Sequence, residues 1–242
     1  MIPIADFFEA FSSSDFWGKS IILLQLAMSV GALGYAIGHY CNLKRFGERI
    51  WEFRRFFSKS RSVFDYQFTH AKSGNPIHEI YFAAMKRLSD GIAATAGFTP
   101  GRPSDVEGRT IKKSSFDLVK GAAEEALAAQ NQRLEAGMNY LGAIATLAPF
   151  LGLLGTVYGV MEAFQDMGKQ GSVNLATVAP YLSTAMLTTV VGLVVAIPSV
   201  LGYNILARKI AALQIQLDGF TDEYLGRVQS EFCEGGADAD GR

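Results

Sequence analysis

Charged residues are missing from three long stretches of this 242-residue chain. No Lys, Arg, Asp or Glu occurs within residues 20–43, 136–161 or 170–207. Since a helix of about 20 apolar residues crosses the hydrocarbon core of a bilayer, each stretch is long enough for one crossing. The sequence therefore predicts an all-α polytopic membrane protein with three transmembrane helices. Two of these helices are expected to extend into a helical cytoplasmic domain.

Residues and motifs that carry metal or enzyme chemistry are also scarce. The chain has two cysteines and three histidines, at positions too scattered to form a metal site. It has no phosphate-binding glycine loop, no Ser-His-Asp arrangement and no dinucleotide-binding fingerprint. The net charge of −1 gives no sign of nucleic-acid binding. We therefore expect no enzymatic activity, no metal, no cofactor and no nucleic-acid partner.

Basic residues follow the first uncharged stretch and set the predicted topology. Lys and Arg clearly outnumber Glu in residues 44–61. Since an excess of basic residues marks the cytoplasmic side of a span, the N-terminus is predicted to be periplasmic and the C-terminus cytoplasmic. The predicted segments are a periplasmic tail (1–19), the first transmembrane helix (20–43), a helical cytoplasmic domain (44–139), the second transmembrane helix (140–163), a periplasmic loop (164–173), the third transmembrane helix (174–207) and a cytoplasmic C-terminal helix and tail (208–242).

The predicted cytoplasmic domain contains several helical patterns. Residues 45–58 and 76–88 form two of them. A further helix is expected to begin near Ser114, with Asp117 in a capping-box position. Its apolar positions continue toward the second span, so the sequence predicts one unbroken helix from about Ser115 into the membrane.

Small residues form one face of the second span and a matching face of the third. They recur at alternating steps of three and four residues, which places them on one side of a helix. Such a face lets another backbone approach closely, which a helix facing lipid does not need. The face comprises Gly142, Ala145, Pro149, Gly152 and Gly159 around Thr156 in the second span, and Ala185, Gly192, Ala196 and Pro198 around Thr189 in the third.

Each small-residue face has a threonine at its centre. A lone polar group on a packed membrane face usually serves a partner or a pathway. The matched pair favours a narrow polar seam in which Thr156 and Thr189 line an ion pathway, with Thr184 and Thr188 as candidate pore-adjacent polar groups on neighbouring faces. The alternative is ordinary helix packing, in which each hydroxyl bonds back to its own helix.

Two motifs carry a resemblance to a known family. APFLGLLGTVYGVMEAF (148–164) and VAPYLSTAMLTTVVGLVVAIPSVLGYN (178–204) resemble the two signature helices of the TolQ/ExbB/MotA family, whose members are ring-forming subunits of ion-driven motors in bacterial inner membranes. The short N-terminal tail and residues 20–30 are more similar to TolQ than to ExbB. Three predicted spans argue against the flagellar stator subunit MotA, which typically has four.

The resemblance implies a set of partners. The family forms rings of five copies that enclose two helices of a single-span protein of the TolR/ExbD/MotB type, which has an aspartate in its membrane helix. Thr156 and Thr189 match the pore-facing threonines of the family. The implied function is to couple proton flow across the bacterial inner membrane to force, which the partner and a TolA/TonB-like transmitter would deliver to the cell envelope.

One departure from the family pattern leaves the transported ion open. TolQ and ExbB have a glutamate at the start of the third span, whereas this chain has Thr184 at that position. The flagellar stators also lack this glutamate. No carboxylate lies within the three uncharged stretches, so we expect the titrating group to come from another subunit. The proton is favoured, and sodium is the alternative because hydroxyl and carbonyl oxygens coordinate hard cations.

A function of a different class also fits part of the pattern. A structural membrane scaffold without ion flux would use the small-residue faces for packing alone. It explains less well why both faces centre on a threonine. A transporter of small solutes is disfavoured, because the three spans show neither an inverted repeat nor an intramembrane charge for a substrate.

The predicted topology can be tested with reporter fusions. A reporter fused after Arg61 or at the C-terminus should lie in the cytoplasm, and one fused near Gln170 in the periplasm, because the basic cluster holds its end of the first span inside. Enzymatic reporters that are active on one side of the membrane only make the measurement. The opposite pattern would overturn the three-span topology.

Overall fold

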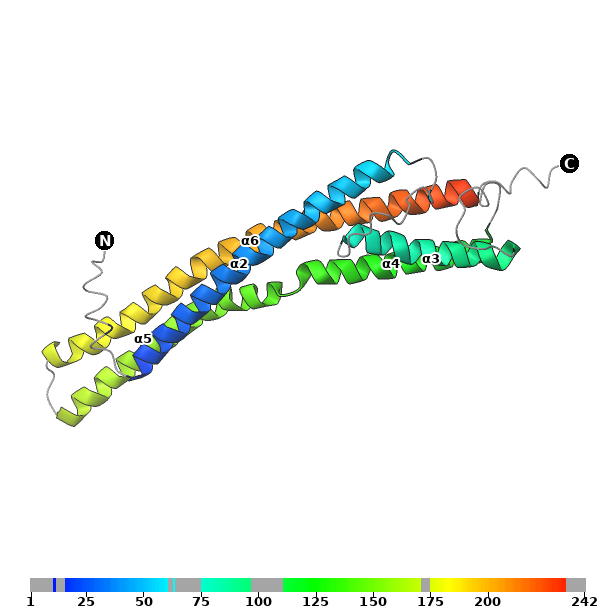
Figure 1. The fold of residues 1–242 in the computed structure, drawn as a ribbon. Coiled ribbons are helices and arrows are strands. Elements are labelled where there is room, and N and C mark those ends of the chain that lie inside the picture. The colour runs from blue at the N-terminus through cyan, green and yellow to red at the C-terminus, as the bar shows by residue number, and fades with distance from the viewer. Residues whose placement is uncertain are drawn as a thin grey trace. The chain divides into compact units, whose positions relative to one another are not determined.

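The computed structural model describes residue 11, residues 16–60, residue 63 and residues 75–96, 111–170 and 175–233, although the side chains of 93–96, 170 and 175–177 are not described. Every regular element in these ranges is an α-helix, which confirms the predicted all-α class. The helices are α2 (Phe16–Phe57), α3 (Pro76–Ala96), α4 (Lys113–Glu135), α5 (Met138–Gln170) and α6 (Leu175–Phe232) (Figure 1). Most of the predicted periplasmic tail, the end of the predicted periplasmic loop and the predicted tail beyond residue 233 lie outside the described residues.

Three described helical stretches are long and apolar enough to cross a membrane. They are Phe16–Phe57, Lys113–Lys169 and Val178–Phe232, and each contains one of the uncharged stretches. The number of candidate spans therefore agrees with the sequence. Helices α2 and α6 both continue far beyond the apolar part, to Phe57 and Phe232 respectively.

The predicted unbroken helix from about Ser115 into the membrane is wrong. Helix α4 ends at Glu135 and α5 begins at Met138, with a turn between them. Gly137 has a φ of 81°, a left-handed conformation that interrupts an α-helix and favours glycine. A Cβ atom at this position would also collide with the side chain of Tyr35. The helices that continue without a break are therefore α2 and α6.

Two further boundaries differ from the sequence prediction. Helix α4 begins at Lys113, and its N-cap residue Lys112 makes no side-chain capping bond, so the predicted capping box with Asp117 is not formed. Helix α5 continues to Gln170, so residues 164–170 of the predicted loop are helical.

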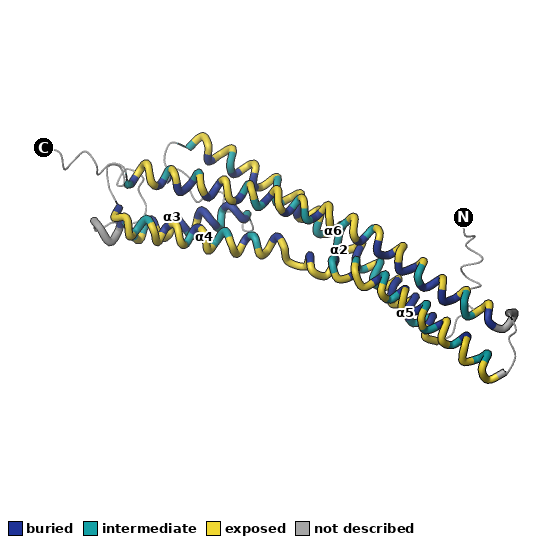
Figure 2. The backbone as a smooth tube through the Cα atoms, turned by 180° about the vertical axis from the view of Figure 1, so that it is seen from behind, coloured by how far each residue is buried: buried dark blue, intermediate teal, exposed yellow. Residues whose placement is uncertain are grey.

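The chain divides into two compact units. The first contains residues 1–40 and 137–208, and the second contains residues 41–136 and 209–242. The first unit contains most of the apolar helical sequence, from α2, α5 and α6. Buried and exposed residues alternate along α5 and α6, as expected for helices with one packed side (Figure 2).

The second unit has an aromatic core. Phe53, Phe57 and Phe220 pack with Tyr81 and Tyr224 at ring-centroid distances of 5.3–6.4 Å. All five side chains are buried. The Tyr81 hydroxyl donates a hydrogen bond to the Val63 carbonyl at 2.7 Å. Burial raises the pKa of the Tyr224 phenol well above its usual value, so this side chain stays neutral at any physiological pH.

Charged side chains pack and pair around this aromatic core. The Arg227 guanidinium lies over the Phe57 ring, 4.5 Å from its centroid, and donates to the Phe57 carbonyl at 3.1 Å. It also pairs with Glu223 at 2.9 Å. Arg133 of α4 pairs with Glu79 of α3 at 2.8 Å. The cation–π contact and the hydrogen bonds of Arg227 to backbone carbonyls thus hold the C-terminal end of α2 on α6.

The turn at Gly137 generates a stability prediction. Gly137→Ala places a Cβ in a left-handed backbone conformation, at a cost of about 1–2 kcal/mol, and against the Tyr35 ring. Gly168→Ala is the control, because a Cβ there meets nothing within 4 Å and alanine favours a helix. Thermal unfolding of the purified chain in detergent should show a lower midpoint for the first variant alone. Equal midpoints would contradict the strained turn.

Candidate functional site

Helices α5 and α6 touch backbone to backbone. A Cβ atom at Gly152 would lie 2.9 Å from the Thr189 Cα and 3.0 Å from the Thr188 carbonyl oxygen. A Cβ at Gly192 would lie 2.6 Å from the Ala148 carbonyl oxygen and 3.3 Å from the Gly152 Cα. No other residue fits at these two positions without separating the helices. We call this contact the glycine crossing.

The small-residue faces continue the contact on both sides of the glycine crossing. A Cβ at Gly159 would lie 2.8 Å from the Ala185 Cβ, and one at Gly142 would lie 3.4 Å from the Tyr203 ring. Ala196 is buried, whereas Ala145, Pro149 and Pro198 are half-buried, and both prolines lie inside their helices. Within one chain these small-residue faces of α5 and α6 pack against each other. The reason is that close backbone approach maximises van der Waals contact where no hydrophobic force drives helices together.

The two predicted ion-pathway threonines lie together at the edge of the glycine crossing. The Thr189 hydroxyl donates to the Gly152 carbonyl across the helix pair at 2.9 Å. The Thr156 hydroxyl donates to the Leu153 carbonyl of its own helix at 2.8 Å. The two hydroxyl oxygens are 3.4 Å apart, and both side chains are half-buried. The sequence-predicted pair is therefore adjacent in space.

The neighbouring threonines lie deeper than this pair. Thr188 is buried, and its hydroxyl donates to the Ala185 carbonyl at 2.7 Å and lies 3.3 Å from the Gly152 carbonyl oxygen. Thr184 is buried as well. The hydroxyls of Thr156 and Thr188 therefore bond to their own helices, as the alternative interpretation expected. The Thr189 hydroxyl instead bonds to the Gly152 carbonyl of the other helix.

Gln25 in the first span belongs to the site as well, although no sequence motif pointed to it. This side chain is completely buried, and its Nε2 donates to the Ala148 carbonyl of α5 at 3.3 Å. The same Nε2 would lie 2.9 Å from a Cβ at Gly192, so α2, α5 and α6 meet at this amide. Its Oε1 is buried and has no hydrogen-bond partner among the described residues. An amide side chain set among the apolar residues of an uncharged stretch is the signal that could have revealed it.

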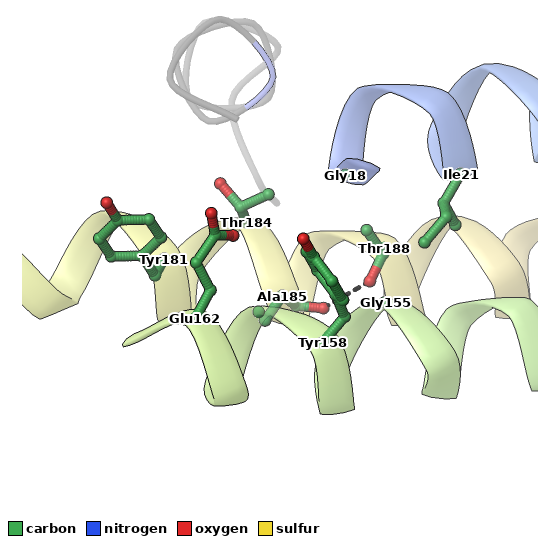
Figure 3. Close-up of a pocket in the computed structure, with 10 residues that line it drawn as sticks. Gly18, Ile21, Gly155, Tyr158, Glu162, Tyr181, Thr184, Ala185 and Thr188 are labelled. Carbon is green, nitrogen blue, oxygen red and sulfur yellow. Dashed lines mark hydrogen bonds between the residues drawn. The ribbon is translucent and has the colours of Figure 1, made fainter. Parts of the chain in front are cut away.

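A small pocket opens beside Thr184 and Thr188, and it contains a carboxylate (Figure 3). Glu162 of α5 lines it together with Tyr181 and both threonines of α6. The titrating group was expected to come from another subunit. That expectation stays a prediction, and this chain adds one carboxylate of its own, because Glu162, the first charged residue after the stretch 136–161, falls within the predicted second span. The third-span position where TolQ and ExbB have glutamate, Thr184 here, lines the same pocket as Glu162.

Comparison with known families decides the classification. The family model described as the MotA/TolQ/ExbB proton channel family matches residues 75–218, which is more than half of the chain. The chain belongs to the MotA/TolQ/ExbB proton channel family. The match includes both α5 and most of the apolar part of α6, and therefore the glycine crossing with its threonines. The resemblance drawn from the two signature helices is confirmed.

Curated relatives within this family carry two names. A Biopolymer transport protein ExbB from Pseudomonas putida is 38% identical over 127 residues, which cover 52% of this chain and 39% of the relative. One of the same name from Salmonella typhimurium is 43% identical over 42% of both chains. A Tol-Pal system protein TolQ from Haemophilus influenzae is 34% identical over 44% of this chain and 48% of the relative. The chain thus spans less than half the length of these relatives.

The glycine crossing generates a packing prediction. Gly152→Leu and Gly192→Leu should separate α5 from α6, because each would drive a side chain into the backbone of the other helix. We expect membrane insertion to persist and partner binding or activity to be lost. Gly168→Leu, on the same helix as Gly152 but in open space, is the control. Pull-down and complementation make the measurement, and full activity in both crossing variants would mean that the close contact is not needed.

Proposed function

We propose that this chain is the ring-forming subunit of a proton-driven motor in the bacterial inner membrane, of the TolQ/ExbB type. The ring, a homo-oligomer of five copies in this proposal, would couple ion flow to force that a single-span partner transmits to the cell envelope. The observation that carries the proposal is the Thr156–Thr189 pair. Its hydroxyl oxygens are 3.4 Å apart at the edge of the glycine crossing, on side chains only half-buried within one chain. Membership of the proton channel family supports it.

The hydroxyl pair suits a carboxylate that changes its protonation state. In the isolated chain both hydroxyl protons are given to backbone carbonyls, of Leu153 and Gly152, which leaves oxygen lone pairs available. A protonated aspartate of a TolR/ExbD-like partner would donate to one of these lone pairs. An ionised aspartate would instead draw a hydroxyl proton away from its carbonyl. The threonines would thus stabilise both states in turn, with only a rotation of the hydroxyl about its Cβ–Oγ bond.

The outer surface of the same helices suits lipid or further copies of the chain. Phe150, Leu153 and Val157 are exposed on α5, and Val194 and Ile197 are exposed on α6. Large exposed apolar side chains are stable against hydrocarbon tails or against another apolar helix. They support assembly within the bilayer, with the N-terminus periplasmic and the C-terminus cytoplasmic as the basic residues predict.

Several finer assignments belong to the same proposal. Both names, TolQ and ExbB, occur among the relatives, and the similarity of residues 20–30 to TolQ favours the TolQ role with a TolA-like force transmitter over the ExbB role with a TonB-like one. A sodium-driven or stator-like relative is the alternative for the ion. A scaffold without ion flux is the alternative of another class, and the Thr189–Gly152 bond, which joins two helices, is the observation that favours it.

Removal of the two hydroxyls separates motor from scaffold. Thr156→Val and Thr189→Val keep the shape of each side chain, and an interhelical hydrogen bond in a membrane contributes only about 0.6 kcal/mol on average, so assembly should persist. A hydrogen bond to an ionised carboxylate contributes about 1.5–3 kcal/mol, so proton flux in membrane vesicles should fall roughly tenfold or more. The matched control is Thr146→Val, since Thr146 bonds to the Gly142 carbonyl on the exposed side of α5. Full flux in both seam variants would favour the scaffold.

A further inference from the structure

The pocket beside the glycine crossing lies at the end of the first unit where α5 ends and α6 begins. Gly18 and Ile21 from the start of α2 line it together with Glu162 on α5 and Thr184 on α6 (Figure 3). The rings of Trp17 and Tyr158, which lines the pocket, are tilted at 53° to each other with their centroids 5.9 Å apart. Aromatic residues of this kind favour the boundary between the bilayer and water. These two aromatic residues are consistent with a carboxylate near the boundary between the bilayer and water.

Thr188 connects this pocket to the threonine seam, by which we mean the polar seam formed by Thr156 and Thr189. It lines the pocket, and its hydroxyl oxygen lies 3.3 Å from the Gly152 carbonyl oxygen. The same carbonyl accepts the hydrogen bond of Thr189, whose oxygen is 3.4 Å from that of Thr156. Oxygen atoms thus follow one another at hydrogen-bond distances from the pocket to the predicted ion pathway.

We propose that Glu162 is a proton-loading carboxylate, which accepts a proton from the adjoining aqueous phase and passes it toward the threonine seam. This inference rests on the proposed function of that seam. In loading, a hydronium ion gives its proton to a carboxylate oxygen, which leaves neutral water and a carboxylic acid. In release, the acid O–H gives its proton to a water molecule or a threonine oxygen on the seam side, while that group hands on a proton of its own, and the carboxylate is restored.

The lining of the pocket suits a proton better than a metal cation. Hard cations in proteins take about six or more oxygen ligands. Beside Glu162, the side-chain oxygens of the lining come only from two threonines and two tyrosines. The other titratable groups facing the carboxylate are Tyr158 of α5 and Tyr181 of α6, whereas α2 contributes uncharged Gly18 and Ile21. A single proton needs only the carboxylate.

Carbodiimide labelling of the full-length chain in native membranes tests the pocket itself. A hydrophobic carbodiimide reacts with a protonated carboxyl in an apolar setting, so peptide mass spectrometry should find the adduct at Glu162. Labelling should decrease as the pH rises, because the reagent needs the acid form. Glu162→Gln should abolish the adduct and lower proton flux at least tenfold, and Glu162→Asp should restore part of both. Asp166→Asn, which removes a carboxylate one turn further along α5 outside the pocket, should leave labelling and flux within twofold of the parent.

The outcomes separate this inference from the proposed function. Flux that depends on Thr156 and Thr189 but not on Glu162, without labelling at Glu162, would overturn the inference and leave the motor intact. Labelling at Glu162 in a chain that conducts no protons would overturn the motor and with it the loading role. Protection of Glu162 by sodium at constant pH would also overturn the inference, because it would show a sodium site in the same pocket.

Discussion

The close contact of two helix backbones at Gly152 and Gly192 is the constraint on which the membrane unit depends. With no side chain at either position, α6 approaches until Thr189 reaches the carbonyl of Gly152 at 2.9 Å. Because Gly192 has no Cβ, there is also room for the Gln25 amide to reach the Ala148 carbonyl, and α2 joins the contact through this buried amide. Larger residues here would remove the van der Waals contact and the interhelical hydrogen bonds together.

Helix packing and an ion pathway are therefore not competing explanations of the small-residue faces. The glycines account for the packing, and the packing sets the positions of the hydroxyls. Because Thr156 and Thr188 give their protons to their own helix while Thr189 bonds across it, the polar atoms of the seam are satisfied within one chain. Their lone pairs are available to a further group without an orphaned donor in the bilayer.

The interruption at Gly137 gives the helices unequal roles. Helices α2 and α6 run without a break from the apolar sequence into the second unit, through Phe57 and Phe232, whereas α4 and α5 are separated by a left-handed glycine. A continuous helix resists bending, and a glycine turn absorbs a change of direction at low cost. The second unit is in turn held together by its aromatic core and by Arg227 over Phe57.

The sequence by itself determined the three spans, the all-α class and the threonine pair, because long uncharged stretches and helical periodicity are local properties of the chain. The two motifs of residues 148–164 and 178–204 carried the resemblance to the family. The tertiary structure decided which faces meet. No local signal predicted that Gly152 would pack on Gly192 within one chain. Nor did any predict that Gly137 would break the predicted helix beside Tyr35, or that Gln25 would reach Ala148. Nor could spacing show that Glu162 and Thr184, on different helices, line one pocket, because that depends on how two distant segments cross.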